Sequence, residues 1–303
     1  MVTISMKYTN DTLGRYYMFI AMVISGSIGY FALESNQASE NIVFARCAIG
    51  SVFLTLYVYF SKKFPSLKEI TWNTVLALII GGVTLVLNWL FLFKSYTELS
   101  MGLTTIIYNT QPFILIILGS ILLKERLKLD HIALVTVSFI GITTIVLGGD
   151  MQQSDIKVTG VLNALIAATL YALSTIYTKK VSNLTPTFIA LCHLLIGLVV
   201  FASFFDVNNF NLNINKVHNL VILGLVHTGF MYIFLYGAYE KSNVSSLAIM
   251  SFVYPLVALI IDVLVYDLVL TTVEVIGVCI ILCSLIIYNS RNYLKPKRNL
   301  QNV

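Results

Sequence analysis

The segment LNWLFLFKSYTELSMGLTTIIYNTQPFILIILGSILLKERL, residues Leu87–Leu127, holds two apolar stretches joined by a short polar connection. Its outline recurs 143 residues later without a gap, so that Tyr96 corresponds to Tyr239 and Pro112 to Pro255. Apolar coincidences are common between membrane helices, but tyrosine and proline matches held in one register over two helices are not. The register therefore predicts an internal repeat.

A second alignment extends the repeat toward the N-terminus. At an offset of 147 residues Gly50 corresponds to Gly197, and Arg46 then stands opposite His193. We interpret the chain as two five-helix repeats, 1–150 and 151–303. An odd number of spans inverts the second copy, and inverted repeats let a central site open to either side of a membrane. Gene duplication without transport is the alternative explanation of the symmetry.

Composition indicates that the solvent of this chain is lipid. Of its 303 residues 58% are hydrophobic and only 11% are charged, whereas a soluble domain carries about 25% charged residues. A spanning helix needs about 20 mostly apolar residues. The sequence predicts an all-α membrane protein with ten transmembrane helices around a central cavity, at 15–33, 41–60, 72–93, 100–122, 130–148, 159–178, 187–205, 218–238, 245–265 and 272–289.

Basic residues indicate how these spans are oriented. With the N-terminus in the cytoplasm, the inner loops hold 15 Lys and Arg residues and the outer loops hold only Lys94, Lys157 and Lys216. The positive-inside rule then places both termini in the cytoplasm of a cell membrane. The formal charge of +5 is explained by this topology, and we expect no nucleic-acid partner.

Several residues carry a resemblance to a known family. They are Arg46, Asn88, Trp89, Pro112, Glu125, His227, Thr228, Gly229, Tyr254 and Pro255. With the two segments Leu87–Leu127 and Gly224–Asp262, they make the chain similar to EamA-type members of the drug/metabolite transporter superfamily. The resemblance implies a ten-helix fold whose cavity is lined chiefly by helices 1–4 and 6–9. It also implies secondary transport of small organic solutes, commonly the export of amino acids, amines or related metabolites.

Motifs for other functions are missing from the sequence. It has no GxxxxGK[ST] phosphate loop, no HExxH and no GxSxG, and its cysteines lack zinc-site spacing. We therefore expect no enzyme, no cofactor, no metal site and no direct use of ATP. The alternatives are a membrane scaffold or sensor that retains the fold and, third, a membrane-embedded enzyme. The expected partners are a small-molecule substrate and the lipid bilayer; proton coupling and a homodimer stay open.

Ionisable residues inside spans are the first candidates for the site, because a charge in lipid costs several kcal/mol and tends to mark function. Arg46 and Asp262 lie at similar depth near the outer side. They are interpreted either as a structural ion pair or as groups for substrate or proton coupling. His193 and His227 are either hydrogen-bonded scaffolding or titrating groups of a proton-coupled carrier.

Amides and aromatic rings near mid-membrane are the second set of candidates. Together they can clamp an amphipathic solute, although interhelical hydrogen bonding would explain them as well. They are Asn88, Trp89, Tyr108, Asn109, Gln111 and Tyr254. Pro112 and Pro255 each lack an N–H, so the carbonyls of Tyr108 and Ser251 lose their helical partner. We predict that both helix breaks border the cavity.

Overall fold

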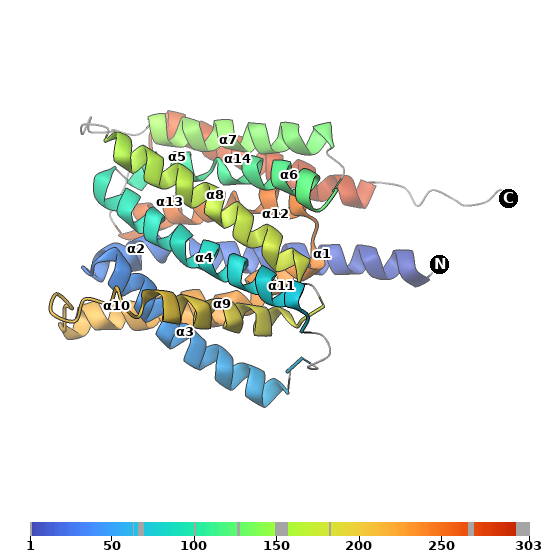
Figure 1. Cartoon of the computed structure of the whole chain (residues 1–303). Coiled ribbons are helices and arrows are strands. Elements are labelled where there is room, and N and C mark those ends of the chain that lie inside the picture. Colours follow the sequence, from blue (N-terminus) through green and yellow to red (C-terminus); the bar gives the residue numbers. More distant parts are fainter. Residues whose placement is uncertain are drawn as a thin grey trace.

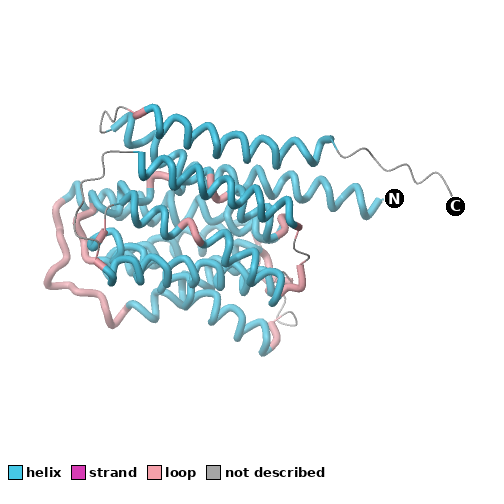
Figure 2. Tube along the Cα trace, turned by 90° about the horizontal axis from the view of Figure 1, so that it is seen from above, coloured by secondary structure: helices cyan, strands magenta, loops and turns pink. Residues whose placement is uncertain are grey.

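The computed structural model describes residues 2–62, 64–65, 70–99, 101–125, 128–148, 157–181, 183–265 and 270–294. Within these ranges all regular structure is helical, and the helices run roughly along one another in a single bundle (Figures 1 and 2). The start of α1 (Val2–Ser25) and the end of α14 (Thr272–Leu294) lie at the same end of the bundle (Figure 1).

Five helices are continuous between α1 and α14. They are α3 (Ser39–Ser61), α4 (Trp72–Glu98), α7 (Leu129–Gly148), α8 (Val158–Lys180) and α9 (Pro186–Phe201). Each is long or apolar enough to cross most of a bilayer at 1.5 Å per residue.

Four predicted spans are interrupted instead. The first breaks between α1 and α2 (Ile28–Glu34), and the fourth between α5 (Met101–Tyr108) and α6 (Gln111–Leu122). The eighth runs through a π-helical segment: α10 (Ile214–Gly224), η2 (Leu225–Phe230) and α11 (Met231–Lys241). The ninth breaks between α12 (Val244–Met250) and α13 (Val253–Val265). Proline explains the breaks in the fourth and ninth spans, whereas no proline lies in the other two.

The described residues contain six helical segments that are long and apolar enough to cross a membrane: Asp11–Glu34, Ser39–Ser61, Trp72–Glu98, Val158–Lys180, Ile214–Lys241 and Val244–Val265. Four shorter apolar helices accompany them: Gln111–Leu122, Leu129–Ile145, Pro186–Phe201 and Thr272–Tyr288. The protein is thus a multi-pass, all-helical membrane protein. The number of ten spans stays a prediction.

Outward faces of the helices carry large apolar side chains, as a lipid-facing surface requires. Val52 of α3, Ile121 of α6 and Val199 of α9 are 63%, 66% and 78% exposed. By contrast, Arg46 and Asn88 are each only 1% exposed. These two polar side chains of the spans are therefore turned inward, while large apolar side chains face outward, which is the reverse of a soluble bundle.

The helices α7 and α14 pack against each other at a pair of glycines. A Cβ atom at Gly141 would lie 2.9 Å from the carbonyl oxygen of Gly277, and one at Gly277 would lie 2.6 Å from that of Gly141. The hydroxyls of Ser138 and Ser284 share a hydrogen bond across the same interface. Small residues allow such close approach of membrane helices, and α7 and α14 form a closely packed pair.

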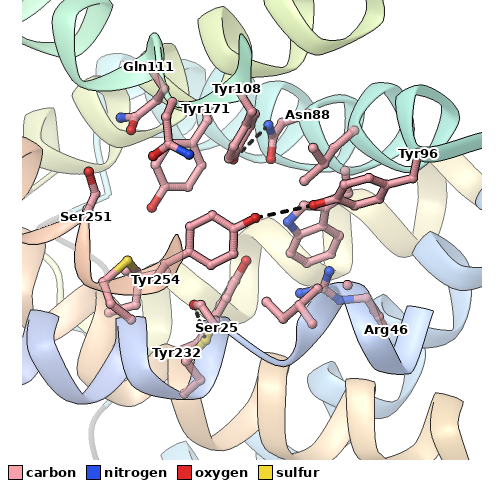
Figure 3. A pocket seen from close by; sticks show the side chains of 18 residues that line it. Ser25, Arg46, Asn88, Tyr96, Tyr108, Gln111, Tyr171, Tyr232, Ser251 and Tyr254 are labelled. Atoms are coloured by element: carbon pink, nitrogen blue, oxygen red, sulfur yellow. Dashed lines mark hydrogen bonds between the residues drawn. The ribbon is translucent and has the colours of Figure 1, made fainter. Parts of the chain in front are cut away.

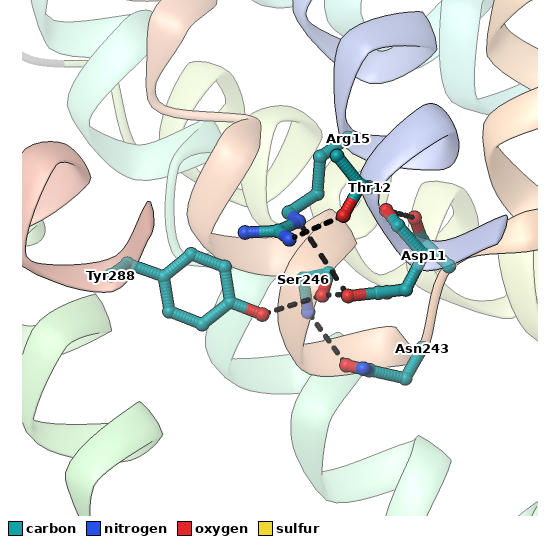
Figure 4. A network of polar contacts seen from close by, with 7 residues as sticks. Asp11, Thr12, Arg15, Asn243, Ser246 and Tyr288 are labelled. Carbon is teal, nitrogen blue, oxygen red and sulfur yellow. Dashed lines mark hydrogen bonds and ion pairs between the residues drawn. The ribbon is translucent and has the colours of Figure 1, made fainter. Parts of the chain in front are cut away.

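A polar network ties three helices together at the end where α1 begins (Figure 4). Arg15 pairs with Asp11 at 3.5 Å within α1. The Ser246 hydroxyl of α12 donates to Asp11 at 3.3 Å and shares a hydrogen bond with the hydroxyl of Tyr288 in α14. Asn243 caps α12 by accepting the Ser246 N–H at 2.9 Å. The network holds α1, α12 and α14 together at this end.

Candidate functional site

A cavity lies among the interrupted helices (Figure 3). The space in which the centre of a water molecule can lie is about 90 Å³, enough for several water molecules. It is lined by Met22, Ser25, Ile28, Gly29, Arg46, Asn88, Trp89, Leu92, Tyr96, Tyr108, Asn109, Gln111, Tyr171, Met231, Tyr232, Leu235, Ser251 and Tyr254. All four interrupted spans contribute to this lining.

Arg46 of α3 is the one charged residue among the described residues of the lining. Its Nε donates to the Thr228 hydroxyl at 3.0 Å. Its guanidinium carbon lies 3.8 Å from the ring centroid of Trp89 and 5.8 Å from that of Phe93. Cation–π contact of this kind is strongest over tryptophan. The guanidinium is therefore held on an aromatic platform at the edge of the cavity.

The π-helix η2 prepares the acceptor for Arg46. The Thr228 hydroxyl donates to the carbonyl of Leu223, five residues earlier, at 2.8 Å. Its proton is thereby committed to the backbone, and its oxygen is left to accept from Arg46 Nε. Single π-turns inside helices are frequent at functional sites, and here the turn positions one hydroxyl.

Two tyrosine pairs border the cavity. The hydroxyls of Tyr96 and Tyr254 lie 3.4 Å apart, and those of Tyr171 and Tyr239 lie 2.8 Å apart. Figure 3 shows the first pair meeting across the space toward which the Arg46 guanidinium points. Tyrosine offers a flat apolar ring and a polar tip, so these side chains line the space with both kinds of surface.

The three amide side chains of the lining differ in how many hydrogen bonds their nitrogens donate. Asn88 Nδ2 donates to the Ala167 carbonyl at 2.7 Å and to the Tyr108 hydroxyl at 3.3 Å. Asn109 Nδ2, just after the end of α5, donates to the Thr105 carbonyl of that helix at 2.7 Å. Gln111 is 4% exposed, and its Nε2 has no hydrogen-bond partner in the described part of the chain. Gln111 is therefore the amide whose nitrogen donates to no described residue.

Both proline-associated breaks border the cavity, where the sequence predicts them. Tyr108 and Gln111 line it on either side of the first break, and Ser251 and Tyr254 on either side of the second. The Ser251 carbonyl is not left open, because it accepts the Tyr254 N–H at 3.2 Å.

Seven of the predicted site residues line the cavity together: Arg46, Asn88, Trp89, Tyr108, Asn109, Gln111 and Tyr254. Neither histidine does. His193 Nδ1 lies 2.7 Å from the Tyr236 hydroxyl, and His227 Nε2 lies 2.7 Å from the Ser27 hydroxyl, just behind the wall. The side chain of Asp262 lies outside the described part of the structure, so its pairing with Arg46 stays a prediction.

Sequence reasoning missed several lining residues, notably Ser25, Tyr96, Tyr171, Tyr232 and Ser251. The repeat register singles out Tyr96 through its match with Tyr239, which is a usable signal. Tyrosine near a span end reads equally well as an interfacial anchor, so the sequence does not separate the two roles. Among the described residues no group of three or more His, Cys, Asp or Glu can hold a metal.

Comparison with known proteins agrees with this architecture. The chain is 30% identical over 250 residues to the "Uncharacterized transporter YxxF" of Bacillus subtilis (strain 168), which covers 81% of this chain and 79% of that protein. It is 24% identical over 199 residues to an "Uncharacterized transporter" of Archaeoglobus fulgidus, covering 64% of this chain and 70% of that protein.

One solved structure, described as a crystal structure of a protein, superposes with a TM-score of 0.79. The superposition covers 93% of this chain and 98% of that one, at 13% identity, and so concerns the fold alone. The profile of the EamA-like transporter family matches residues 12–147 and again residues 158–290. This chain therefore belongs to the EamA-like transporter family.

Proposed function

We propose that this chain is a secondary transporter that exports a small organic metabolite, such as an amino acid, an amine or a related solute, across the cell membrane by alternating access. The cavity is its solute site. The proposal includes ten spans in two inverted repeats, 1–150 and 151–303, and both termini in the cytoplasm. The observation that carries it is a cavity built from interrupted helices of both halves.

The pairing of helices supports the repeat. The repeat relates α4 to α11 and α8 to α1. The pair α4–α8 therefore corresponds to the pair α11–α1, and both pairs are in extensive contact. The repeat also relates α3 to α9 and α7 to α14, and the two helices of each of these pairs are in contact with each other. The double match of the family profile points the same way. Inverted repeats of this kind are the usual basis of alternating access.

Two groups of helices face each other across the cavity, and each draws on both repeats. We call α4, α5, α6 and α8 the first group, and α1, α11, α12 and α13 the second group, because the members of each pack together. Both tyrosine pairs, Tyr96–Tyr254 and Tyr171–Tyr239, join the first group to the second. Rocking of one group against the other would break these contacts and open the cavity.

Tyr96 and Tyr239 are repeat-mates near opposite ends of α8. Ser95, next to Tyr96, donates to the carbonyl of Gly160 at the start of α8. At the other end of α8, Lys179 Nζ donates to the Tyr239 carbonyl at 3.1 Å. Inverted repeat-mates belong at opposite ends of a carrier, and each of these two tyrosines is placed to close one end.

Counterflow in proteoliposomes tests the function. The purified protein is reconstituted with a panel of amino acids, amines and organic acids, with and without a pH gradient, in vesicles sorted by orientation to measure direction. Ser25→Phe fills the cavity and should abolish exchange, whereas Val52→Phe on the lipid face should not. Wild-type protein that exchanges none of these solutes would favour the scaffold or sensor alternative.

A further inference from the structure

The cavity holds a positive charge that no carboxylate of the described residues matches. Arg46 is the one charged residue of the lining, and within the described part of the chain no carboxylate lies within 4.0 Å of its guanidinium. Arginine stays protonated at any accessible pH, and an unpaired charge inside a membrane protein is costly. The charge is therefore available to an anion that enters the cavity.

The contacts of Arg46 leave one edge of the guanidinium free. Nε is bound to Thr228, and the flat face lies on Trp89. These contacts fix the plane of the guanidinium. Neither Nη nitrogen takes part in them, because the bond from Nε to Thr228 is the only hydrogen bond that the side chain makes with a described residue. A planar fork of parallel N–H groups matches a carboxylate in bidentate fashion. Figure 3 shows the guanidinium directed toward the Tyr96–Tyr254 pair.

Gln111 supplies a second, independent observation on the other side of the cavity. Its Nε2 is buried without a described partner, and the side chain lies across the cavity from Arg46 (Figure 3). A buried donor without a partner is costly, and a ligand acceptor would satisfy it. Gln111 is also the first residue of α6, whose N-cap Thr110 makes no side-chain capping bond. The positive end of a helix dipole adds to the preference for electron-rich groups.

The space between Arg46 and Gln111 is walled by rings and thioethers rather than charges. Met22, Leu92, Met231 and Leu235 contribute apolar surface, and the tyrosines contribute flat faces. Among the described residues, no aspartate or glutamate belongs to the lining. An ammonium group would find ring faces and neutral amide and hydroxyl oxygens there, but no described carboxylate, and it would lie close to the repulsive charge of Arg46.

We infer that the cavity takes an organic monoanion whose carboxylate pairs with Arg46, whose apolar or aromatic body lies among the tyrosines, and whose far end offers an oxygen acceptor to Gln111. The inference rests on the proposed function, because it names the solute class of that same site. It excludes amines as the preferred solutes.

The chain contains a reporter for this binding. Its two tryptophans are Trp72, which is 76% exposed at the start of α4, and Trp89, whose ring is the platform of Arg46. Trp72→Phe leaves Trp89 as the single source of indole fluorescence. Titration of this variant in nanodiscs with phenylacetate, phenylacetamide and phenethylamine compares a carboxylate, an amide and an amine on one carbon skeleton.

We expect phenylacetate to bind about tenfold or more tightly than the amide or the amine, as a charge-assisted bond implies. Arg46→Gln in this background should remove that preference, and Arg46→Lys should restore part of it. Lys94→Gln, which removes a surface cation paired with Glu40 at 2.9 Å, should leave it unchanged. For 4-hydroxyphenylacetate, Gln111→Leu should remove the gain in affinity over phenylacetate.

Several results would overturn the inference. Equal affinity for the three probes, preference for the amine, or no binding of either carboxylate would each do so. Asp262→Asn gives a further control. If Asp262 forms an ion pair with Arg46, this substitution frees the guanidinium and strengthens phenylacetate binding about tenfold. That result would also contradict the inference. Counterflow of amines without carboxylate binding would leave the proposed transport function intact while ending the inference.

Discussion

We predict that phenylalanine substitutions at the repeat-mates Tyr96 and Tyr239 shift the conformational equilibrium in opposite directions. Tyr96→Phe removes the hydroxyl that meets Tyr254, and Tyr239→Phe removes the hydroxyl that meets Tyr171. Both bonds join the first group of helices to the second, near opposite ends of the cavity. If the groups rock against each other, Tyr96→Phe should favour the conformation open to the outside. Tyr239→Phe should favour the conformation open to the cytoplasm.

The size of each shift follows from the bond that is lost. Side-chain hydrogen bonds between membrane helices contribute about 0.6 kcal/mol on average, and neutral hydrogen bonds in proteins contribute about 1 kcal/mol. These energies change a two-state equilibrium by about threefold to fivefold. At 3.4 Å the Tyr96–Tyr254 contact is near the limit for a hydrogen bond, whereas Tyr171–Tyr239 at 2.8 Å is well formed. The Tyr239 variant should therefore show the larger shift.

Cysteine accessibility measures the shift directly. Ser251→Cys places one thiol in the cavity wall of a background in which Cys47, Cys192, Cys279 and Cys283 are replaced. The rate of labelling by an impermeant maleimide, added from one side and then the other, reports access to the cavity. Tyr96→Phe should raise the rate from outside about twofold to threefold and lower it from inside. Tyr239→Phe should do the reverse, and the double variant should return toward the parent.

Tyr59→Phe is the matched control, because Tyr59 is 65% exposed on the lipid side of α3. It should leave both rates unchanged. If Tyr96→Phe and Tyr239→Phe shift access in the same direction, the tyrosines do not close opposite ends, and the inverted relation between them is wrong. Unchanged rates in both variants would mean that the hydroxyl pairs carry no part of the conformational equilibrium.

Three further outcomes are expected. Lys62→Cys should be protected from an impermeant reagent outside the cell and Asn208→Cys should react, and labelling of position 62 would reverse the proposed orientation. Pro255→Ala restores an N–H that can extend α13 toward α12, so uptake into proteoliposomes should fall while the yield of folded protein stays normal; normal uptake would separate the break from transport. Gly141→Ala puts a Cβ 2.9 Å from the carbonyl of Gly277, which should cost about 1–3 kcal/mol and lower the melting temperature in detergent without changing solute specificity at the temperatures where it stays folded.

How much of the fold follows from sequence depends on what breaks each helix. Pro112 and Pro255 predict the breaks beside them, because a proline lacks the backbone N–H that a helix needs. The break at Gly26–Ser27 has only a Gly–Ser pair, a weaker signal than proline, and the π-turn at Leu225–Phe230 has no proline. Both lie at tertiary contacts: Arg46 bonds to Thr228 in the π-turn, and the Ser27 hydroxyl lies 2.7 Å from His227 Nε2. A local pattern does not contain those partners.

The site was predictable by residue type more than by geometry. A charge in an apolar run makes Arg46 the first candidate for the site, and the amides and rings around it follow by depth. What the pattern lacks is the rotation of each helix about its axis. His193 and Asn109 look alike as polar residues in apolar runs, yet one faces Tyr236 and the other faces the cavity. The sequence also suggests a carboxylate beside Arg46; the described contacts are a hydroxyl and two aromatic rings, and the side chain of Asp262 lies outside the described part of the structure.

The contacts between the two groups of helices are unequal at the two ends of the cavity. Toward the end that the positive-inside rule assigns to the cytoplasm, Lys179 Nζ donates to the carbonyl of Ser242 at 2.6 Å, and the Glu125 carboxylate accepts the Val244 N–H at 3.0 Å. Toward the other end, the described residues offer the neutral Tyr96–Tyr254 contact at 3.4 Å. Charge-assisted bonds are roughly twice as strong as neutral ones. Among the described contacts, opening of the proposed carrier toward the cytoplasm would therefore break the stronger set.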